Sequence, residues 1–132
     1  MKQRLTKPVS QEPADLDENL AIAIRAAREK KAINLVALDL REVTSFADYF
    51  LICSGTSTRQ VQAISDEILE RLKKSGTRSL HVEGYQVAQW ALLDYGNLIV
   101  HVFAEDAREF YDLERLWRDA KRLEIREEED HS

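Results

Sequence analysis

The chain has 132 residues, of which 44% are hydrophobic and 33% are charged, with 4 Gly and 2 Pro. This composition excludes a disordered, collagen-like or low-complexity protein, and the length fits one domain. Lysine and arginine number 19 against 24 acidic residues, for a net charge of -5. We therefore expect little or no direct nucleic-acid binding and a basic protein as the better partner, although a local basic patch is compatible with the average.

No apolar run approaches the roughly 20 residues that a membrane-spanning helix needs. No signal peptide is visible, so we expect a cytoplasmic protein without membrane contact. The single cysteine, Cys53, excludes an internal disulfide and a multi-cysteine zinc site.

In chain order, the pattern predicts a flexible N-terminal tail, one α/β domain and a charged C-terminal tail. Their bounds are 1–14, 15–118 and 119–132. The domain has the element order α-β-β-α-β-β-β-α, which predicts an α/β (α+β) fold with one mixed sheet of about five strands flanked by helices. The expected strands cover 35–40, 49–53, 79–83, 89–94 and 98–103.

Capping signals mark the expected helices. Asp15 with Glu18 forms a capping-box pattern at the start of the first helix, which ends near residue 32. Thr56 or Ser57 caps the second helix, and Gly76 stands where a left-handed residue ends it. The third helix opens near residue 105, and its apolar set is Ala107, Phe110, Leu113, Leu116 and Trp117.

A polar loop follows the second strand and consists of Ser54, Gly55, Thr56 and Ser57. Backbone N–H groups at a helix start can bind phosphate, so a phosphate loop is one interpretation and simple capping and turn geometry is the favoured one. No Gly-Lys-Ser/Thr follows the loop. A nucleotidyltransferase would also need clustered carboxylates for magnesium, whereas the strands offer Asp39, Glu83 and Asp94 singly.

The histidines and the cysteine indicate structure rather than chemistry. His101 shares a strand face with Ile99 and Phe103, so a buried, hydrogen-bonded imidazole is favoured over a catalytic or metal role. Cys53 ends an apolar strand without a basic neighbour, which is typical of an inert buried thiol. We predict no catalytic residues, no metal site and no cofactor.

The strand around Trp90 is apolar on both faces. Trp90, Leu92 and Asp94 alternate onto one face, while residues 91, 93 and 95 point to the other. Such a strand is either fully covered or presents an apolar face to a partner. Composition alone favours core for Trp90, because large aromatic residues are mostly buried.

The last helix carries a second aromatic pattern. Tyr111, Glu114 and Trp117 are spaced i, i+3 and i+6, so they predict one stripe along a continuous helix. The stripe is offset from Ala107, Phe110 and Leu113 of the same helix. It is therefore a candidate dimer or packing surface.

Several short motifs occur together in a fixed order. They are Ala47-Asp48-Tyr49-Phe50, Ser54-Gly55-Thr56-Ser57, Glu83-Gly84, Trp90, Asp94-Tyr95-Gly96, Ile99-Val100-His101-Val102-Phe103 and Tyr111-Asp112-Leu113-Glu114-Arg115-Leu116-Trp117. Together they resemble the ribosomal silencing factor family, also called RsfS or Iojap, over residues 16–118. The tails at both ends are idiosyncratic.

The resemblance implies a translation repressor rather than an enzyme. Members bind ribosomal protein L-fourteen on the large ribosomal subunit and sterically block association with the small subunit, and organellar relatives support large-subunit assembly. The implied fold is a nucleotidyltransferase-like core that lacks catalytic carboxylates, in agreement with the missing acid pair. Crystallised members of the family are often dimers, so a homodimer is one expectation.

The resemblance shifts Trp90 from core to contact. The implied partner-binding residues are Trp90, Leu92, Asp94, Tyr95 and Glu83. Trp90 and Leu92 would supply apolar area, and Asp94 and Glu83 would face basic residues of the ribosomal protein. The alternative is a magnesium-dependent nucleotidyltransferase or a nucleotide-binding protein that uses the loop at 54–57.

Overall fold

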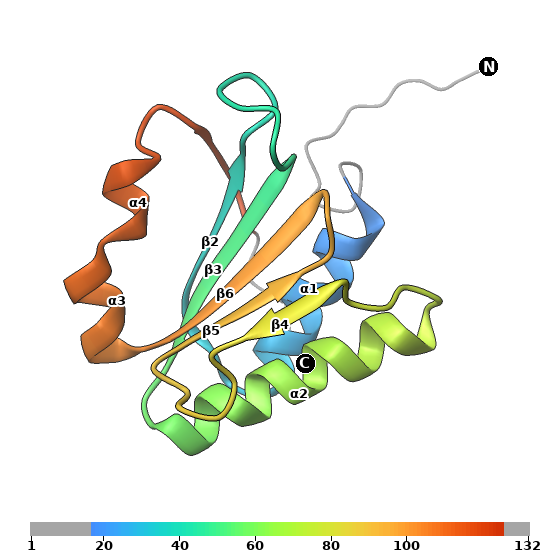
Figure 1. Cartoon of the computed structure of the whole chain (residues 1–132), viewed down its shortest axis with the longest axis vertical. Helices are drawn as coiled ribbons and strands as arrows, with labels where there is room; N and C mark the ends of the chain where they lie inside the picture. The colour runs from blue at the N-terminus through green and yellow to red at the C-terminus, as the bar shows by residue number, and fades with distance from the viewer. Residues whose placement is uncertain (1–16, 126–132) are drawn as a thin grey trace.

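The computed structural model describes residues 17–125, which form four helices and six strands in one mixed sheet. The sheet order is β4-β5-β6-β3-β2-β7 (Figure 1). The strands are β2 (Ile33–Asp39), β3 (Tyr49–Gly55), β4 (His81–Glu83), β5 (Trp90–Asp94), β6 (Leu98–Ala104) and β7 (Lys121–Leu123). The helices are α1 (Glu18–Glu29), α2 (Thr58–Lys74), α3 (Glu105–Tyr111) and α4 (Leu113–Leu116).

The centre of the sheet is a parallel pair, β3 with β6, and all other neighbours pair antiparallel. Every residue of β3 is buried, as expected for a strand covered on both faces. The predicted mixed sheet with flanking helices is therefore confirmed, with one more strand than expected.

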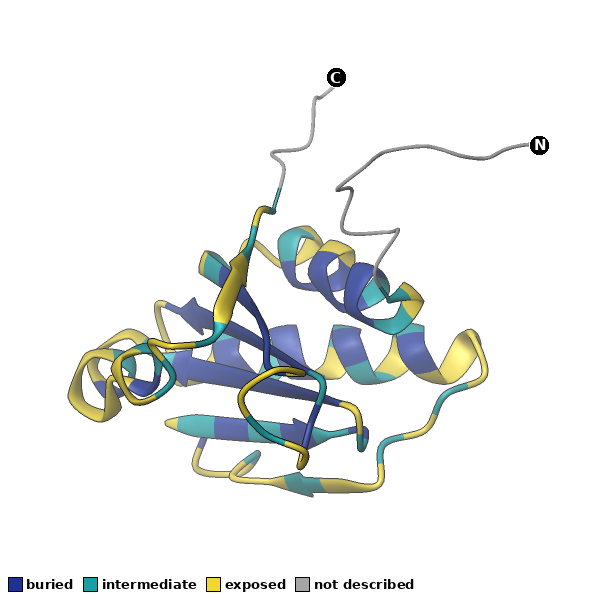
Figure 2. Cartoon of the chain, turned by 90° about the horizontal axis from the view of Figure 1, so that it is seen from above, coloured by how far each residue is buried: buried dark blue, intermediate teal, exposed yellow. Residues whose placement is uncertain are grey.

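The two faces of the sheet are covered differently (Figure 2). The helical face lies under α1 and α2, whose buried residues include Leu20, Ile24, Ile64 and Ile68. The opposite face carries Phe50, Trp90, His101 and Phe103, and we call these four residues the aromatic face. Helix α3 lies beside β3 and β6 at one end of that face, and Leu113 of α4 packs on the same face (Figure 1).

Local signals decide the helix ends. The cap of α1 is Asp17, whose carboxylate accepts a hydrogen bond from the Asn19 N–H at 3.0 Å. The predicted cap, Asp15, lies outside the described residues. Ser57 caps α2 and Gly76 follows it with φ at 104°, as the sequence predicts.

Two expectations at the C-terminal end are wrong. The last helix is not continuous, because Asp112 adopts a left-handed conformation with φ at 49° and separates α3 from α4. Residues 121–123, inside the segment predicted as a charged tail, instead form β7 and pair with β2. Ordered structure therefore extends past residue 118 on one edge of the sheet.

Candidate functional site

The structure places four of the five expected partner-binding residues on the same side of the sheet. β5 pairs antiparallel with β4, so Glu83 stands opposite Leu92 and His81 stands opposite Asp94. Directly opposed residues on antiparallel strands point to the same face. Trp90, Leu92, Asp94 and Glu83 therefore form one surface on the aromatic side, which we call the β4–β5 surface.

Tyr95 does not belong to this surface. Its side chain is buried on the helical face together with Ala91 and Leu93. Its hydroxyl has no hydrogen-bond partner in the described structure, and burial raises the pKa of Tyr95 to about 12. The strand alternation already separated residue 95 from residue 90, so assigning Tyr95 to the same contact was inconsistent with strand geometry.

Trp90 is half-buried and held by aromatic neighbours. Its ring centroid lies 4.9 Å from that of Phe103 and 4.7 Å from that of Tyr111. Its indole Nε1 donates a hydrogen bond to Nδ1 of His101 at 3.1 Å. One side of the ring therefore packs on the sheet and the rest remains exposed. Contact of Trp90 with a partner stays a prediction.

Gly84 lets the backbone approach Trp90 closely. Gly84 has φ at 78°, and a Cβ at this position would overlap the carbonyl oxygen of Trp90. Only glycine satisfies both conditions. The turn after β4 thus fixes the start of β5 and the place from which the Trp90 side chain projects.

His101 lies beneath this surface as a neutral imidazole. The residue is 3% exposed, and burial lowers the pKa of its imidazole to about 3. Because Nδ1 accepts from Trp90, the proton sits on Nε2, which has no partner in the described structure. The prediction of a buried histidine is confirmed, and its hydrogen bonding is only half satisfied.

The outer end of the β4–β5 surface is acidic. Glu83 Oε2 lies 2.7 Å from Nε2 of His81, and Asp94 Oδ1 accepts a hydrogen bond from the Gly96 N–H at 2.8 Å. Both carboxylates keep exposed area. An apolar centre flanked by carboxylates suits a partner that presents an apolar residue beside lysine or arginine.

The second candidate set splits at the break between α3 and α4. Tyr111 is 50% exposed and packs against Trp90 with the two rings tilted by 48°, whereas Trp117 is half-buried against Phe50 with centroids 5.6 Å apart. Glu114 points inward to Arg108. The three residues therefore do not form one stripe.

The most exposed apolar side chains on these helices are ones that the periodicity assigned to the core. Phe110 is 80% and Leu116 is 76% exposed, while Leu113 is buried. A continuous helix would turn residues 110, 113 and 116 to one side, but the left-handed Asp112 changes that relation. Phe110 packs edge-on against Tyr111, with centroids 5.0 Å apart, and extends the exposed aromatic area beyond Trp90.

A polar cluster fixes α3 and α4 on the sheet. Arg108 donates to Glu114 through Nη2 at 2.8 Å and through Nε at 3.3 Å, and through Nη1 to the hydroxyl of Ser54 at 2.8 Å. Burial would raise the pKa of Glu114, but the hydrogen bonds and charge of Arg108 outweigh it and lower the pKa. Arg108 thus connects α3, α4 and β3 across the break at Asp112.

The polar groups of the loop at 54–57, the alternative phosphate site, form hydrogen bonds within the chain. Ser54 and Gly55 belong to β3 and are buried. The Ser54 hydroxyl accepts from Arg108, the Thr56 N–H and hydroxyl donate to Gln60, and Ser57 caps α2. These contacts support the structural interpretation of the loop.

Within residues 17–125, no group of three or more histidine, cysteine, aspartate or glutamate side chains could hold a metal ion. Among the helices of this part of the chain, none has both the length and the apolar character to cross a bilayer. Cys53 is fully buried, and burial raises the pKa of its thiol to about 12, as expected for an inert cysteine.

Fold and surface together define a small α+β protein with one helix-covered sheet face and one aromatic face that is half open. The profile of a family described as "Ribosomal silencing factor during starvation" matches residues 13–132. The chain therefore belongs to the ribosomal silencing factor family.

Individual relatives agree. A protein of Halalkalibacterium halodurans named ribosomal silencing factor RsfS is 44% identical over 108 residues, covering 82% of this chain and 92% of that protein. The Bacillus subtilis protein of the same name is 46% identical over 101 residues, covering 76% and 86%. A crystal structure of a Bacillus halodurans protein has a TM-score of 0.74 and 41% identity, covering 82% of this chain and 98% of that one.

An organellar relative carries a different name. The mouse protein "Mitochondrial assembly of ribosomal large subunit protein 1" is 28% identical over 102 residues, covering 75% of this chain and 45% of the mouse protein.

Proposed function

We propose that this protein is a ribosomal silencing factor that represses translation in the cytoplasm. It binds the large ribosomal subunit through ribosomal protein L-fourteen and blocks association with the small subunit. The names of the bacterial relatives support the silencing role, and the name of the mouse relative supports a further role in large-subunit assembly.

The single observation that carries the proposal is the half-open aromatic face. Trp90 and Leu92 are only partly buried on the β4–β5 surface, next to the exposed Phe110 and Tyr111. Rigid aromatic side chains surrounded by packed neighbours are the usual energetic centre of a protein interface. Their fixed positions also reduce the entropy lost on binding.

Blocking subunit association in this way needs no chemistry. A footprint of about 1,600 Å² in total is enough for a stable specific complex. A protein bound there excludes, by its volume, any second body that would occupy the same surface. The carboxylates of Asp94 and Glu83 attract a basic ribosomal protein and raise the association rate.

The test is co-sedimentation of the full-length protein with separated large and small ribosomal subunits. We expect binding to the large subunit only, and loss of binding in Trp90→Ala and Glu83→Lys. Val87→Ala is the matched control, because Val87 is 71% exposed in a loop whose backbone Gln62 of α2 holds.

Two outcomes would contradict the proposal at different points. Wild-type protein that binds neither subunit would overturn the silencing function. Trp90→Ala protein that sediments with large subunits as well as the wild type would overturn the assignment of the β4–β5 surface. Circular dichroism of each variant verifies that the fold is retained.

The exposed Phe110 and Leu116 on α3 and α4 favour a second interaction, a homodimer. Phe110 continues the aromatic area of Trp90 and Tyr111, so a second copy and the ribosomal protein would compete for adjoining surface. Light scattering of wild type and Phe110→Ser across a concentration series tests this. Wild-type protein that is monomeric at every concentration would contradict the proposed homodimer.

The nucleotidyltransferase alternative has a direct test as well. Calorimetric titration with ATP and magnesium should give no heat of binding, since the polar groups of Ser54, Thr56 and Ser57 are engaged within the chain. Saturable ATP binding that is weakened in Ser57→Ala would instead support nucleotide binding by this loop.

A further inference from the structure

A histidine interrupts an otherwise apolar row of the aromatic face. The strand β6 (Leu98–Ala104) contains six apolar residues and the buried His101. The neighbours of His101 across the sheet are Ile52 on β3 and Leu92 on β5. A leucine at this position would continue the apolar row without burying a polar atom. The presence of a histidine therefore has a reason other than packing.

The buried imidazole is unfavourable for stability. Its Nε2–H has no hydrogen-bond partner within residues 17–125, where the Tyr95 hydroxyl is the other buried side-chain group of this kind. An unpaired N–H in an apolar site is costly, because it loses its hydrogen bonds to water on folding. The Phe50 ring, whose centroid lies 4.5 Å from that of His101, offers no oxygen or nitrogen acceptor. Stability alone would therefore favour an aliphatic residue over His101.

The side-chain hydrogen bond that His101 does form joins it to Trp90. Nε1 of the indole donates to Nδ1 of the imidazole at 3.1 Å. Phe103 and Tyr111 also contact the indole, with interplanar angles of 30° and 48°. These apolar contacts restrict the plane of the indole ring but do not select its orientation within that plane. The hydrogen bond selects it, because the bond forms only when Nε1 faces His101.

The same hydrogen bond leaves only apolar atoms of Trp90 available to a partner. Nε1 is the single polar atom of a tryptophan side chain. Because Nε1 is paired within the chain, a partner that covers the indole contacts carbon atoms and leaves no N–H unpaired. Trp90 is half-buried, so part of this carbon surface is accessible. At this point of the β4–β5 surface, a partner therefore needs to offer only apolar area.

We propose that His101 is a positioning residue that holds Trp90 in the orientation required for partner binding. By accepting the indole N–H, His101 fixes the ring before a partner binds and keeps its polar atom turned inward. This role rests on the proposed function, because the orientation of Trp90 matters only if Trp90 contacts the partner. A side chain already held in its bound orientation loses less entropy on binding, so the benefit is in affinity rather than in stability.

The test measures the affinity of full-length His101→Leu for large ribosomal subunits by co-sedimentation at neutral pH over a concentration series. We expect binding about fivefold weaker than in the wild type, which corresponds to one net hydrogen bond. The midpoint of urea denaturation should stay close to that of the wild type, because removal of the unpaired Nε2–H offsets the lost hydrogen bond. His101→Gln retains an acceptor and should recover most of the affinity.

A second measurement observes the indole N–H directly. The chain has two tryptophans, so an NMR spectrum of isotope-labelled protein contains two indole N–H resonances, and Trp90→Phe identifies the one from Trp90. In His101→Leu this resonance should shift and its proton should exchange faster with water. The resonance of Trp117 should stay in place. The measurement needs no ribosomal subunit, so it is independent of the proposed function.

Tyr95→Phe is the matched control, since it also removes a buried polar group without a described partner, but from the helical face. It should change neither the affinity for large subunits nor the Trp90 resonance. If circular dichroism shows that His101→Leu does not fold, His101→Met replaces it, because methionine adapts to irregular core space.

The possible failures are distinguishable. A folded His101→Leu or His101→Met variant that binds large subunits as the wild type does would overturn the proposal, and so would an unchanged Trp90 resonance. Wild-type protein that binds neither subunit would refute the proposed function and this role with it, even if the Trp90 resonance shifts as expected.

Discussion

The two faces of the sheet are both apolar in sequence and play different physical roles. The helical face is filled mainly with aliphatic side chains and alanine under α1 and α2, and its aromatic residues are Tyr49 and Tyr95. The aromatic face combines Phe50, Trp90, His101 and Phe103 with polar groups, and it is partly open. Hydrophobic residues alone therefore indicate that a strand is buried in the sheet. The face available to a partner is identified by aromatic side chains that the helices leave partly exposed.

The sharpest test of this difference uses two adjacent leucines. Leu93 is fully buried on the helical face and Leu92 is half-buried on the aromatic face. Leu93→Ala should lower the free energy of unfolding by about 2–5 kcal/mol, and Leu92→Ala by about 1 kcal/mol or less. Urea denaturation measures both.

Binding should show the reverse order. Leu92→Ala should weaken co-sedimentation with large subunits, while Leu93→Ala protein that is still folded should bind as the wild type does. Equal losses of stability in the two variants would refute the contrast between the faces.

The second prediction concerns pH. His101 has a pKa of about 3 in the folded protein and an ordinary value of 6.5. Between these values the unfolded chain binds a proton that the folded chain does not, so stability falls as the pH falls from about 6.5 toward about 3. We expect a loss of about 1 kcal/mol per pH unit in this window.

Urea denaturation at pH 7.5, 6 and 5 measures this loss. The control is His101→Gln, which can still accept the hydrogen bond from Trp90 and does not titrate. A dependence of the same size in His101→Gln would assign the effect to other groups.

The third prediction tests how α3 and α4 stay on the aromatic face. Arg108→Met removes the partner of both Glu114 and Ser54, so we expect a loss of about 1–3 kcal/mol from unpaired buried polar groups. Glu114→Gln should cost less, because the amide still accepts one hydrogen bond from Arg108. Partner affinity should fall in the same order, since Tyr111 of α3 packs against Trp90.

Exposed Arg115→Met on α4 is the control for the change of residue type. If Arg108→Met and Arg115→Met have the same stability, the polar cluster does not hold the two helices in place.

The smallest expected effect lies on the helical face. Tyr95 buries a hydroxyl without a hydrogen-bond partner in the described structure. Tyr95→Phe should therefore raise the free energy of unfolding by up to about 1 kcal/mol, because a polar group leaves an apolar site. Thermal unfolding detects the shift, and a loss of stability would mean that the hydroxyl has a partner in solution.

Local sequence patterns predicted the elements whose formation depends on neighbouring residues in the chain. Ser57 and Gly76 bound α2 as predicted, because capping and left-handed ends use particular residue types. The apolar run of β3 likewise predicted a central strand. The alternation along β5 correctly separated Trp90 from Leu93.

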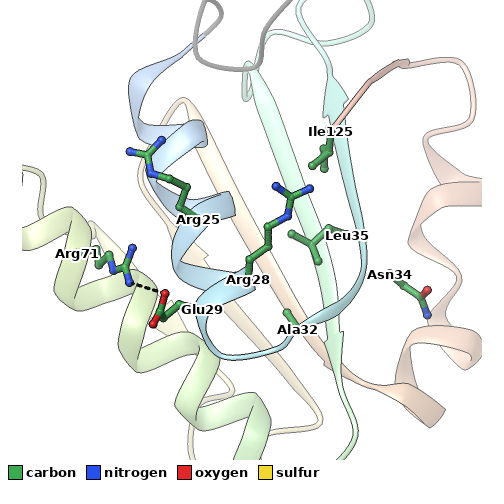
Figure 3. Close-up of a pocket in the computed structure, with 8 residues that line it drawn as sticks. All are labelled: Arg25, Arg28, Glu29, Ala32, Asn34, Leu35, Arg71 and Ile125. Carbon is green, nitrogen blue, oxygen red and sulfur yellow. Dashed lines mark ion pairs between the residues drawn. The ribbon is translucent and has the colours of Figure 1, made fainter. Parts of the chain in front are cut away.

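The expectations that failed depend on nonlocal structure or on a single backbone angle. The break at Asp112 has no glycine or proline to signal it, although aspartate tolerates the left-handed region better than most residues. β7 has the charged sequence Lys-Arg-Leu, and its pairing with β2 joins segments about 80 residues apart in the chain. Arg25, Arg71 and Ile125 likewise line one pocket although they come from distant segments, so no local sequence pattern predicts it (Figure 3).

The parallel pairing of β3 with β6 has a consequence for how the chain folds. β3 and β6 are neighbours in the sheet, but α2, β4 and β5 lie between them in the sequence. Forming this pair therefore brings together segments more than 40 residues apart in the chain. Such a closure costs about 3 kcal/mol of chain entropy before any contact repays it. During synthesis, β3 leaves the ribosome before β6, so this apolar strand is at first unpaired. We expect early packing of α2 on β3 to reduce pairing of β3 with a neighbouring chain.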